Sequence, residues 1–304
     1  MSLAPKRHKI ALTTYITLEM PLKRLLTFEY DKIRVIPLGV LGVVGIFLLS
    51  LLLEILLGSV FYSIGDLGFK ETPLIASIII NFGLWVTKIV ILIVVAKLTI
   101  ELGSPRTQSP FKNWVKSDRM KQLLVLTAAI VIFYRLAYDS QLGLMIVKNF
   151  GIDPDLTESM QLILGAPVLG VLYILLIAPI FEEIFFRGII FGGLRQKGHG
   201  VIFATIVSAL LFALMHMNVA QGVNAFFLGL LATYVYHQTG NLKSAIWLHV
   251  INNAYVVFSS GWMDGTFEKI PILPRLIAMS IGILVSVILL KHYRLKAERL
   301  NTLE

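Results

Sequence analysis

The sequence contains no cysteine, which excludes disulfide bonds, thiolate catalysis and zinc sites built on cysteine ligands. It is also poor in charge, because only 15% of its 304 residues are Asp, Glu, Lys or Arg, whereas soluble globular proteins carry about 25%. With 57% hydrophobic residues and a mean hydropathy of +0.81, the chain has too little polar surface to cover a soluble core. These deficits predict an integral membrane protein.

The charge that is present is mostly basic, with a formal net charge of +9. An excess of Lys and Arg in cytoplasmic loops explains this value in a membrane protein. Nucleic-acid binding would require a basic soluble face with base-reading side chains, and no such segment is visible, so we expect no nucleic-acid partner. Residues 1–34 lack the short apolar core and cleavage site of a signal peptide, and we expect a cytoplasmic or interfacial segment there.

Long apolar blocks predict an all-α polytopic membrane protein with about eight transmembrane helices. The predicted spans are residues 35–57, 74–98, 123–138, 167–194, 201–217, 223–237, 244–259 and 276–290. Segment 244–259 is short and carries polar residues. We divide the chain into the N-terminal segment 1–34, accessory helices in 35–160, a catalytic core of four helices in 161–260, and a last helix with a basic tail in 261–304.

Loop charges predict the orientation of these spans. The segments after spans two and four and the C-terminal tail are basic, whereas the alternate loops are acidic. Because basic loops stay in the cytoplasm, both termini are predicted to be cytoplasmic, and we favour a bacterial plasma membrane.

The fourth span contains two adjacent carboxylates, Glu182 and Glu183, followed by Arg187. An ionisable residue at the bilayer centre costs about 2.5–3.5 kcal/mol on the insertion scale, so such residues are candidates for function. Glu183 and Arg187 are four residues apart and are predicted to pair on one helix face. Glu182 points roughly 100° away, since an α-helix has about 3.6 residues per turn, and is left available as a base.

Two further polar motifs lie on other predicted helices. Phe212 and His216 share a face at the end of the fifth span, and His249 and Asn253 share a face of the seventh. Each motif alone is compatible with helix packing, because His and Asn hydrogen-bond across membrane helices. The depth of each motif in the membrane can be counted at about 1.5 Å per residue from the cytoplasmic end of its helix. By this count both motifs lie at a depth close to that of Glu182, and helix tilt can absorb the remaining differences. The three motifs can therefore form one site.

This set of residues suits hydrolysis without a Ser or Cys nucleophile. Glu182, helped by His216, can deprotonate a water molecule, and His249 with Asn253 can donate hydrogen bonds to the oxyanion formed at a carbonyl. Zinc bound by Glu182, His216 and His249 is the alternative, since three protein ligands are typical of hydrolytic zinc sites. The His-Glu-x-x-His signature of common zinc proteases is missing, and we favour the mechanism without a metal or other cofactor.

The three motifs resemble the CPBP family of intramembrane proteases, also called the ABI family, which includes type II CAAX prenyl proteases and bacteriocin-processing and immunity proteins. The family pattern is Glu-Glu-x-x-x-Arg, Phe-x-x-x-His and His-x-x-x-Asn, and all three occur here in order, within residues 160–260. The resemblance implies an eight-helix fold, water activation by Glu182 with His216, and an oxyanion role for His249 and Asn253. It implies supporting roles for Glu183, Arg187 and Phe212.

The expected function is therefore intramembrane cleavage of a peptide or of a lipidated protein. Two alternatives remain open: a non-catalytic immunity or binding protein on the same scaffold, and a proton-coupled transporter that uses Glu182 and His216 as a relay. The sequence does not indicate the substrate, whether it is prenylated, or the oligomeric state.

Two other pairs of charged residues occur in or near the spans. Arg135 and Asp139 are four apart and are predicted to pair. Glu54 lies roughly 29 Å from the predicted start of its span and Lys88 only about 15 Å from the same membrane face, so we expect these two not to pair directly.

Overall fold

The computed structural model describes residues 34–69, 71–101, 121–151, 154–259 and 269–301. The predicted N-terminal segment therefore lies outside the described residues except for Arg34, as does most of the basic loop after the second span. Within the described ranges the chain is almost entirely helical, which confirms the all-α class.

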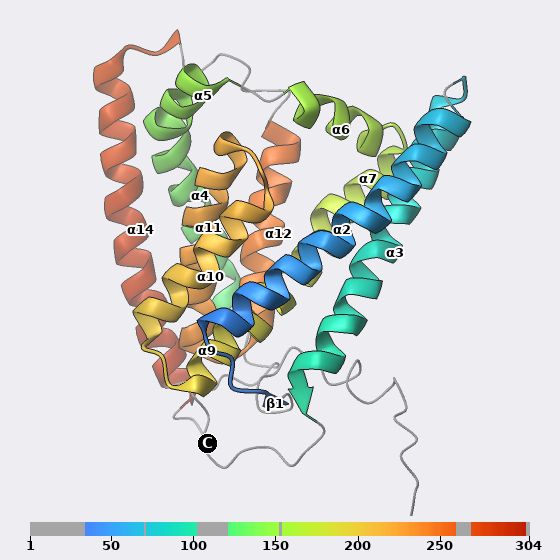
Figure 1. Ribbon diagram of the computed structural model, residues 1–304. Helices are drawn as coiled ribbons and strands as arrows, with labels where there is room; N and C mark the ends of the chain where they lie inside the picture. Colours follow the sequence, from blue (N-terminus) through green and yellow to red (C-terminus); the bar gives the residue numbers. More distant parts are fainter. Residues whose placement is uncertain (1–33, 70, 102–120, 152–153, 260–268, 302–304) are drawn as a thin grey trace, which may run out of the picture.

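The helices run up and down a single bundle (Figure 1). The first two crossings are α2 (Val40–Gly68) and α3 (Pro73–Thr99), and the third is α4 (Lys121–Ala137), which continues through the π-helix η2 (Tyr138–Gly143) into α5 (Leu144–Phe150). The helix α6 (Pro154–Leu164) follows at one end of the bundle. The fourth crossing joins α7 (Pro167–Leu172), η3 (Tyr173–Ile177), α8 (Ala178–Glu183), η4 (Ile184–Phe191) and α9 (Gly192–Lys197). The last crossings are α10 (Val201–Met215), α11 (Val219–Thr239), α12 (Leu242–Ser259) and α14 (Ile272–Asn301).

Six of these crossings are long and apolar enough to span a membrane, as far as the structure describes the chain. They cover Val40–Gly65, Pro73–Thr99, Lys121–Phe150, Pro167–Lys197, Val219–Thr239 and Ile272–Leu300. The two other predicted spans form helices that do not meet this standard. The helix α10 has only 15 residues, and α12 carries Lys243, His249, Asn252 and Asn253 within its 18 residues. The protein is thus a multi-pass membrane protein with six candidate spans rather than eight confirmed ones.

A two-stranded antiparallel sheet, which the sequence analysis did not predict, closes one end of the bundle. The strand β1 (Arg34–Val35) pairs with β2 (Ile100–Glu101), so that the start of the described chain is fixed to the end of α3. The amide of Leu38 donates to the carbonyl of Gly193 at 2.9 Å, which also ties this segment to α9. The sheet, α9 and the C-terminal end of α14 lie at the same end of the molecule, opposite α5 and α6 (Figure 1).

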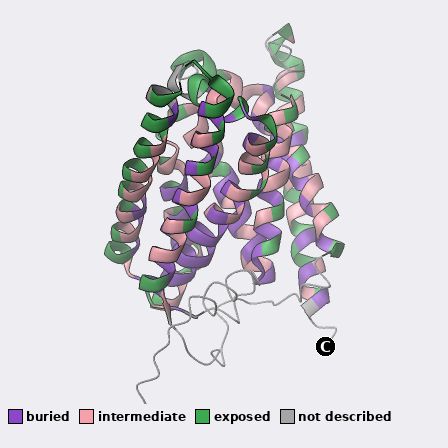
Figure 2. Ribbon diagram, turned by 90° about the vertical axis from the view of Figure 1, so that its right-hand side faces the viewer, coloured by how far each residue is buried: buried purple, intermediate pink, exposed green. Residues whose placement is uncertain are grey.

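The distribution of side chains fits a lipid environment. Buried residues gather inside the bundle, and the outward faces of the outer helices are exposed (Figure 2). The exposed residues of α2 and α14 include many large apolar side chains, such as Leu41, Leu48, Ile277 and Leu284. An apolar surface of this extent is typical of a membrane-facing one, and the helical backbone satisfies its own hydrogen bonds there.

Close helix contacts hold the centre of the bundle together. A Cβ atom at Gly229 of α11 would lie 3.0 Å from the Cβ of Ala209 in α10 and 3.2 Å from Nη2 of Arg187. Small residues of this kind let membrane helices approach each other closely. The contact at Gly229 therefore places α10 and α11 directly against the charged part of the fourth crossing.

Candidate active site

The fourth crossing carries the paired carboxylates between two π-helical segments, η3 and η4. A π-helix bonds residue i to i+5, is rare, and occurs frequently at functional sites. Hydrophobic periodicity gives no signal for such a segment, so the sequence analysis treated the whole crossing as one α-helix. In the structure, the α-helical section between the two π segments ends at Glu183.

Glu183 and Arg187 form the predicted ion pair. Nη1 of Arg187 donates to Oε1 of Glu183 at 3.0 Å, and both side chains are fully buried. The guanidinium carbon also lies 4.7 Å from the centre of the Phe212 ring, a cation–π contact that partly offsets the loss of hydration.

His249 of α12 joins this pair to Glu182. Its Nδ1 lies 2.8 Å from Oε1 of Glu183, and its Nε2 lies 3.6 Å from Oε2 of Glu182. Because a carboxylate only accepts hydrogen bonds, Nδ1 carries the proton shared with Glu183. The ring is therefore held with Nε2 toward Glu182, and protonation of Nε2 would make it a second donor. We call the connected set Arg187, Glu183, His249 and Glu182 the charge chain.

The two carboxylates differ in exposure within the charge chain. The side chain of Glu183 is fully buried, whereas that of Glu182 is 14% exposed. Glu182 is therefore the more accessible of the two carboxylates.

Phe212 lies at the meeting point of the three motifs. Its ring centre is 5.0 Å from that of His216 and 5.6 Å from that of His249, in edge-to-face arrangements. The same ring faces Arg187. Both histidines thus contact one buried aromatic side chain, which the sequence analysis had placed only in a supporting role.

His216 caps the end of α10 at a tight turn. Its Nδ1 lies 2.9 Å from the carbonyl oxygen of Phe212. Since a carbonyl only accepts, Nδ1 is the donor, and in the neutral ring Nε2 then carries the lone pair. The next residue, Met217, has a positive φ of 51°, a conformation that is uncommon outside glycine. Asn218 then caps α11 by accepting from the amide of Gln221 at 2.8 Å, which fixes the turn that presents His216.

Asn253 lies one turn after His249 on α12 and contacts η3. Its Nδ2 donates to the carbonyl of Ile174 at 2.9 Å, and its Oδ1 accepts from Asn252 at 3.3 Å. An amide NH₂ has two hydrogens, so one donor remains beyond the bond to Ile174.

The sequence analysis named Lys88 and Glu54 but was wrong about whether they pair. Nζ of Lys88 in α3 lies 2.5 Å from Oε1 of Glu54 in α2, so the expectation that these residues do not pair is wrong. The same ammonium group lies 4.8 Å from the ring centre of Phe181, the residue before Glu182. A charged residue inside each of two apolar spans was the signal that could have indicated this pair. The pair of Arg135 and Asp139, by contrast, is confirmed at 2.7 Å.

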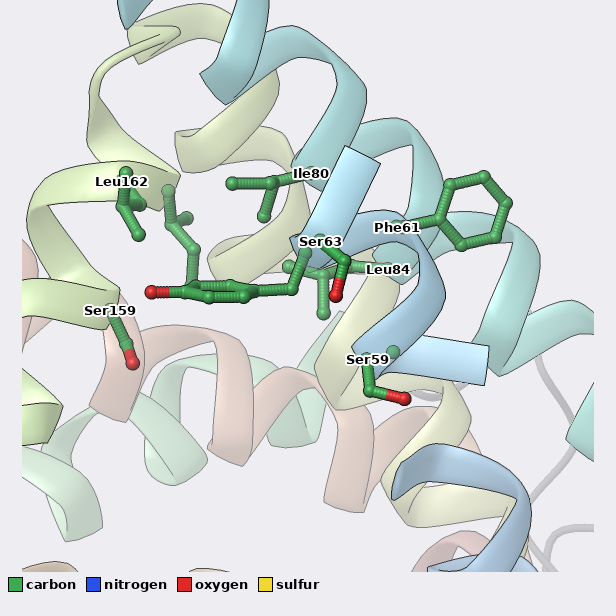
Figure 3. A pocket seen from close by; sticks show the side chains of 10 residues that line it. Ser59, Phe61, Ser63, Ile80, Leu84, Ser159 and Leu162 are labelled. Carbon is green, nitrogen blue, oxygen red and sulfur yellow. The ribbon is translucent and has the colours of Figure 1, made fainter. Parts of the chain in front are cut away.

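A cavity of about 380 Å³ lies between α2, α3 and α6 (Figure 3). Its lining is mostly apolar and includes Ile80, Leu84 and Leu162. Polar groups in the lining include the hydroxyl groups of Ser59, Ser63 and Ser159. Gly58 and Leu84 in this lining are each four residues, or about one helical turn, from Glu54 and Lys88. The cavity is therefore separated from the Glu54–Lys88 pair by a single turn on each helix.

The alternative zinc site is not assembled in this arrangement. Across the described ranges, no three His, Asp or Glu side chains are grouped closely enough to hold a metal ion. Within the part of the chain that the structure describes, His216 makes neither a hydrogen bond nor an ion pair with Glu182 or Glu183, and Nδ1 of His249 is already bonded to Glu183. The donor set Glu182, His216 and His249 thus does not fit a metal as placed here.

The candidate site lies in a segment of the chain that is similar to known proteins. Residues 164–255 match a family model described as type II CAAX prenyl endopeptidase, Rce1-like. The chain is 28% identical over 188 residues to the membrane-embedded CAAX protease MroQ of Staphylococcus aureus strain USA300, covering 58% of this chain and 76% of that protein.

Two further bacterial relatives are similar at the same level. The chain is 28% identical over 111 residues to the putative membrane peptidase YdiL of Bacillus subtilis strain 168, covering 36% of this chain and 45% of the relative. It is 28% identical over 164 residues to the UPF0177 protein YxdF of Lactococcus lactis strain IL1403, covering 53% and 89%. No solved structure gives a significant match. The matched segment contains every residue of the charge chain but neither Glu54 nor Lys88.

Proposed function

Because the chain belongs to the Rce1-like type II CAAX prenyl endopeptidase family, we propose that it is an intramembrane endopeptidase that uses Glu182 and His216 to activate water. The observation that carries this proposal is the charge chain, which presents the partly exposed Glu182 carboxylate beside a histidine held by a second, buried carboxylate. Membership makes the protein a hydrolase of the CAAX protease type, and the residue roles and substrate below are the proposal.

The reaction begins with a water molecule at Glu182. The carboxylate takes a proton from the water as the oxygen attacks the carbonyl carbon of the scissile peptide bond, forming a C–O bond. In the neutral ring of His216, whose Nδ1 donates to the carbonyl of Phe212, Nε2 accepts a second hydrogen bond from the same water and orients it.

Negative charge then develops on the former carbonyl oxygen. His249 donates to this oxyanion from Nε2 when that nitrogen carries a proton, and Asn253 donates with its remaining amide hydrogen. The C–N bond breaks as Glu182 returns its proton to the leaving nitrogen. The immediate products are a carboxylic acid and an amine, which exchange one proton to become a carboxylate and an ammonium group, and the Glu182 carboxylate is restored.

The substrate is proposed to be a membrane-associated or lipidated peptide or protein. The site lies inside a bundle with an apolar outer surface, so a peptide that is itself held in the bilayer reaches it without leaving the membrane. We propose a bacterial plasma membrane with both termini cytoplasmic, in agreement with the bacterial relatives and with the basic α9 at the same end as the C-terminal end of α14.

The test uses purified protein in lipid vesicles and two internally quenched peptides that end in a CAAX sequence, one farnesylated and one not. Wild type is compared with Glu182→Gln, His216→Ala and the matched control Glu71→Gln, which lies on an exposed turn between α2 and α3. We expect Glu182→Gln and His216→Ala each to lose about 10²–10⁴-fold in cleavage rate, the usual contribution of a general base, and Glu71→Gln to match wild type.

Each outcome has a clear meaning. Cleavage of the farnesylated peptide alone assigns a prenylated substrate, and cleavage of both assigns a peptide substrate. Full activity in a correctly folded Glu182→Gln variant would overturn the proposed mechanism. No cleavage of either peptide, or of any membrane peptide from cells that lack the protein, would favour the immunity or binding protein, and dependence on a proton gradient would favour the transporter.

A further inference from the structure

Asn252 of α12 is bonded to the proposed oxyanion donor Asn253, although the His-x-x-x-Asn motif leaves position 252 open. It lies three residues after His249, on the same face of the helix, and its side chain is buried at 2% exposure. Its Nδ2 donates to Oδ1 of Asn253 at 3.3 Å. Among the described residues, this is the one hydrogen bond that the Asn252 side chain makes.

Another buried asparagine, Asn81 of α3, has a structural role that Asn252 does not share. Asn81 is fully buried, and its Nδ2 donates to the carbonyl of Ser77 on its own helix and to that of Ile163 on α6, each at 2.9 Å. These bonds to the backbone join two helices. Within the described ranges, the side chain of Asn252 makes no bond to the backbone of another helix, so helix packing does not explain its amide.

The stability of the fold also gives no reason for an amide at position 252. Oδ1 of Asn252 is buried and accepts no hydrogen bond from the part of the chain that the structure describes. A buried acceptor without a partner is destabilising, and an apolar side chain of the same shape is often as favourable or more so. The benefit of Asn252 must therefore come from its bond to Asn253.

That bond holds the second polar atom of the Asn253 amide. The carbonyl of Ile174 in η3 accepts from Nδ2 of Asn253 at 2.9 Å, while Asn252 donates to Oδ1. A single hydrogen bond would let the amide plane turn about the axis of that bond, whereas bonds at both polar atoms fix the plane. The remaining Nδ2 hydrogen then points in one direction. A donor whose direction is set before the reaction stabilises an oxyanion best, because it needs no reorganisation.

We propose that Asn252 is a positioning residue that fixes the Asn253 amide for the oxyanion formed during peptide hydrolysis. This inference rests on the proposed function and, within it, on the oxyanion role of Asn253. Asn252 acts on the transition state through Asn253 and not by contact with the substrate. Its removal should therefore lower kcat and leave KM unchanged, because the oxyanion forms only after the substrate has bound.

The experiment is a double-mutant cycle on kcat in vesicles, with the CAAX peptide that the wild type cleaves. The variants are Asn252→Leu, Asn253→Ala and the two combined. Leu is similar in size to Asn and removes both the donor and the unpaired acceptor. We expect Asn252→Leu to lower kcat about 3- to 10-fold, the usual contribution of one hydrogen bond. In the Asn253→Ala background the same change should have no further effect, because no amide remains to be positioned.

The stability of each variant is measured in parallel by unfolding in detergent micelles. Asn252→Leu should be at least as stable as wild type, because it removes an unpaired buried acceptor. The matched control is Asn81→Leu, since Oδ1 of Asn81 is also buried and unpaired among the described residues. This control should lose stability with its two bonds and keep the kcat of wild type. If Leu does not fit at position 252, Asn252→Ala removes the same amide and the cycle is repeated with it.

A purely structural role of Asn252 gives the opposite pattern. Removal of its amide would then lower stability, and its loss of kcat would multiply with that of Asn253→Ala. This pattern, or the kcat of wild type in Asn252→Leu, would overturn the inference and leave the proposed function intact. The kcat of wild type in Asn253→Ala would remove the oxyanion role and this inference with it, while water activation by Glu182 would stand. If the wild type cleaves neither CAAX peptide, the proposed function falls first.

Discussion

Replacing Glu183 with Gln should destabilise the folded protein strongly, whereas the same change at the adjacent Glu182 should leave stability nearly unchanged. Glu183 is fully buried and accepts from both Arg187 and His249. Its replacement leaves the buried guanidinium of Arg187 without a counter-charge, a loss of about 3–5 kcal/mol in the free energy of unfolding. Among the residues that the structure describes, Glu182 accepts no hydrogen bond within normal distance, since His249 is 3.6 Å away, so Glu182→Gln should cost about 1 kcal/mol or less.

A double variant tests whether the ion pair is the cause. When both charges are removed in Glu183→Gln with Arg187→Met, no unpaired charge remains, and apolar replacement of a buried pair is often nearly neutral. The double variant should therefore recover most of the stability that Glu183→Gln loses. What it does not recover measures the contact of Glu183 with His249, for which about 0.5–1.5 kcal/mol is typical.

The assay is reversible unfolding in mixed detergent micelles, followed by tryptophan fluorescence and helical circular dichroism. Cleavage of the quenched peptide is measured on the same samples below their unfolding transitions. Equal losses of stability in Glu182→Gln and Glu183→Gln would refute the conclusion that Glu183 stabilises the fold and Glu182 does not. A double variant no more stable than Glu183→Gln would refute the assignment of the loss to an unpaired Arg187.

Three further predictions concern the packing and chemistry around the site. Gly83→Ala should separate α2 from α3 and lower stability by about 1–3 kcal/mol, since its Cβ would lie 2.2 Å from the Phe61 Cβ, whereas Gly45→Ala, with nothing within 4 Å, should be neutral in the same unfolding assay. Asn253→Ala should lower kcat about 10²-fold or more, as expected for an oxyanion donor. A rate equal to that of wild type would show that Asn253 does not have this role. Because Asn253 also donates to the carbonyl of Ile174, the stability of the variant must be measured in parallel. A chelator should leave peptide cleavage unchanged, and a loss of activity that zinc restores would contradict the metal-free mechanism.

Local spacing on one helix was the most reliable guide in the sequence. The four-residue separations of Glu183 from Arg187 and of Arg135 from Asp139 predicted ion pairs that the structure contains. Such pairs depend only on helix geometry, and no knowledge of the rest of the fold is needed to predict them.

Contacts between helices were harder to predict, and Glu54 with Lys88 shows why. The prediction against pairing counted depth from residue 35, but α2 begins at Val40. From that start Glu54 lies roughly 21 Å along its helix, and Lys88 lies roughly 17 Å from Thr99 at the end of α3. An error of five residues in one helix boundary was enough to separate two side chains that touch.

The contacts of His249 could be predicted only in part. Its convergence with the fourth crossing was expected from depth, and the structure places it against both glutamates. Its hydrogen bond to Glu183 was not expected. The rotation of α12 about its own axis decides which glutamate His249 contacts, and the sequence does not indicate this rotation. The π-helical segments on either side of the glutamates were equally hidden, since each changes the helix by one hydrogen-bonding step without altering composition.

The Glu183–Arg187 pair also has a consequence for how the chain enters the membrane during synthesis. His249 is made 66 residues after Glu183, so the fourth crossing must insert before its partner on α12 exists. Two unpaired charges near the centre of that crossing would oppose insertion by about 2.5–3.5 kcal/mol each. Arg187→Ala should therefore reduce insertion of this crossing in a chain truncated after residue 200, as measured by glycosylation mapping, and unchanged insertion would contradict this view. The fourth crossing carries its own counter-ion one turn away, and so the nascent helix can leave the translocon before the rest of the site has been translated.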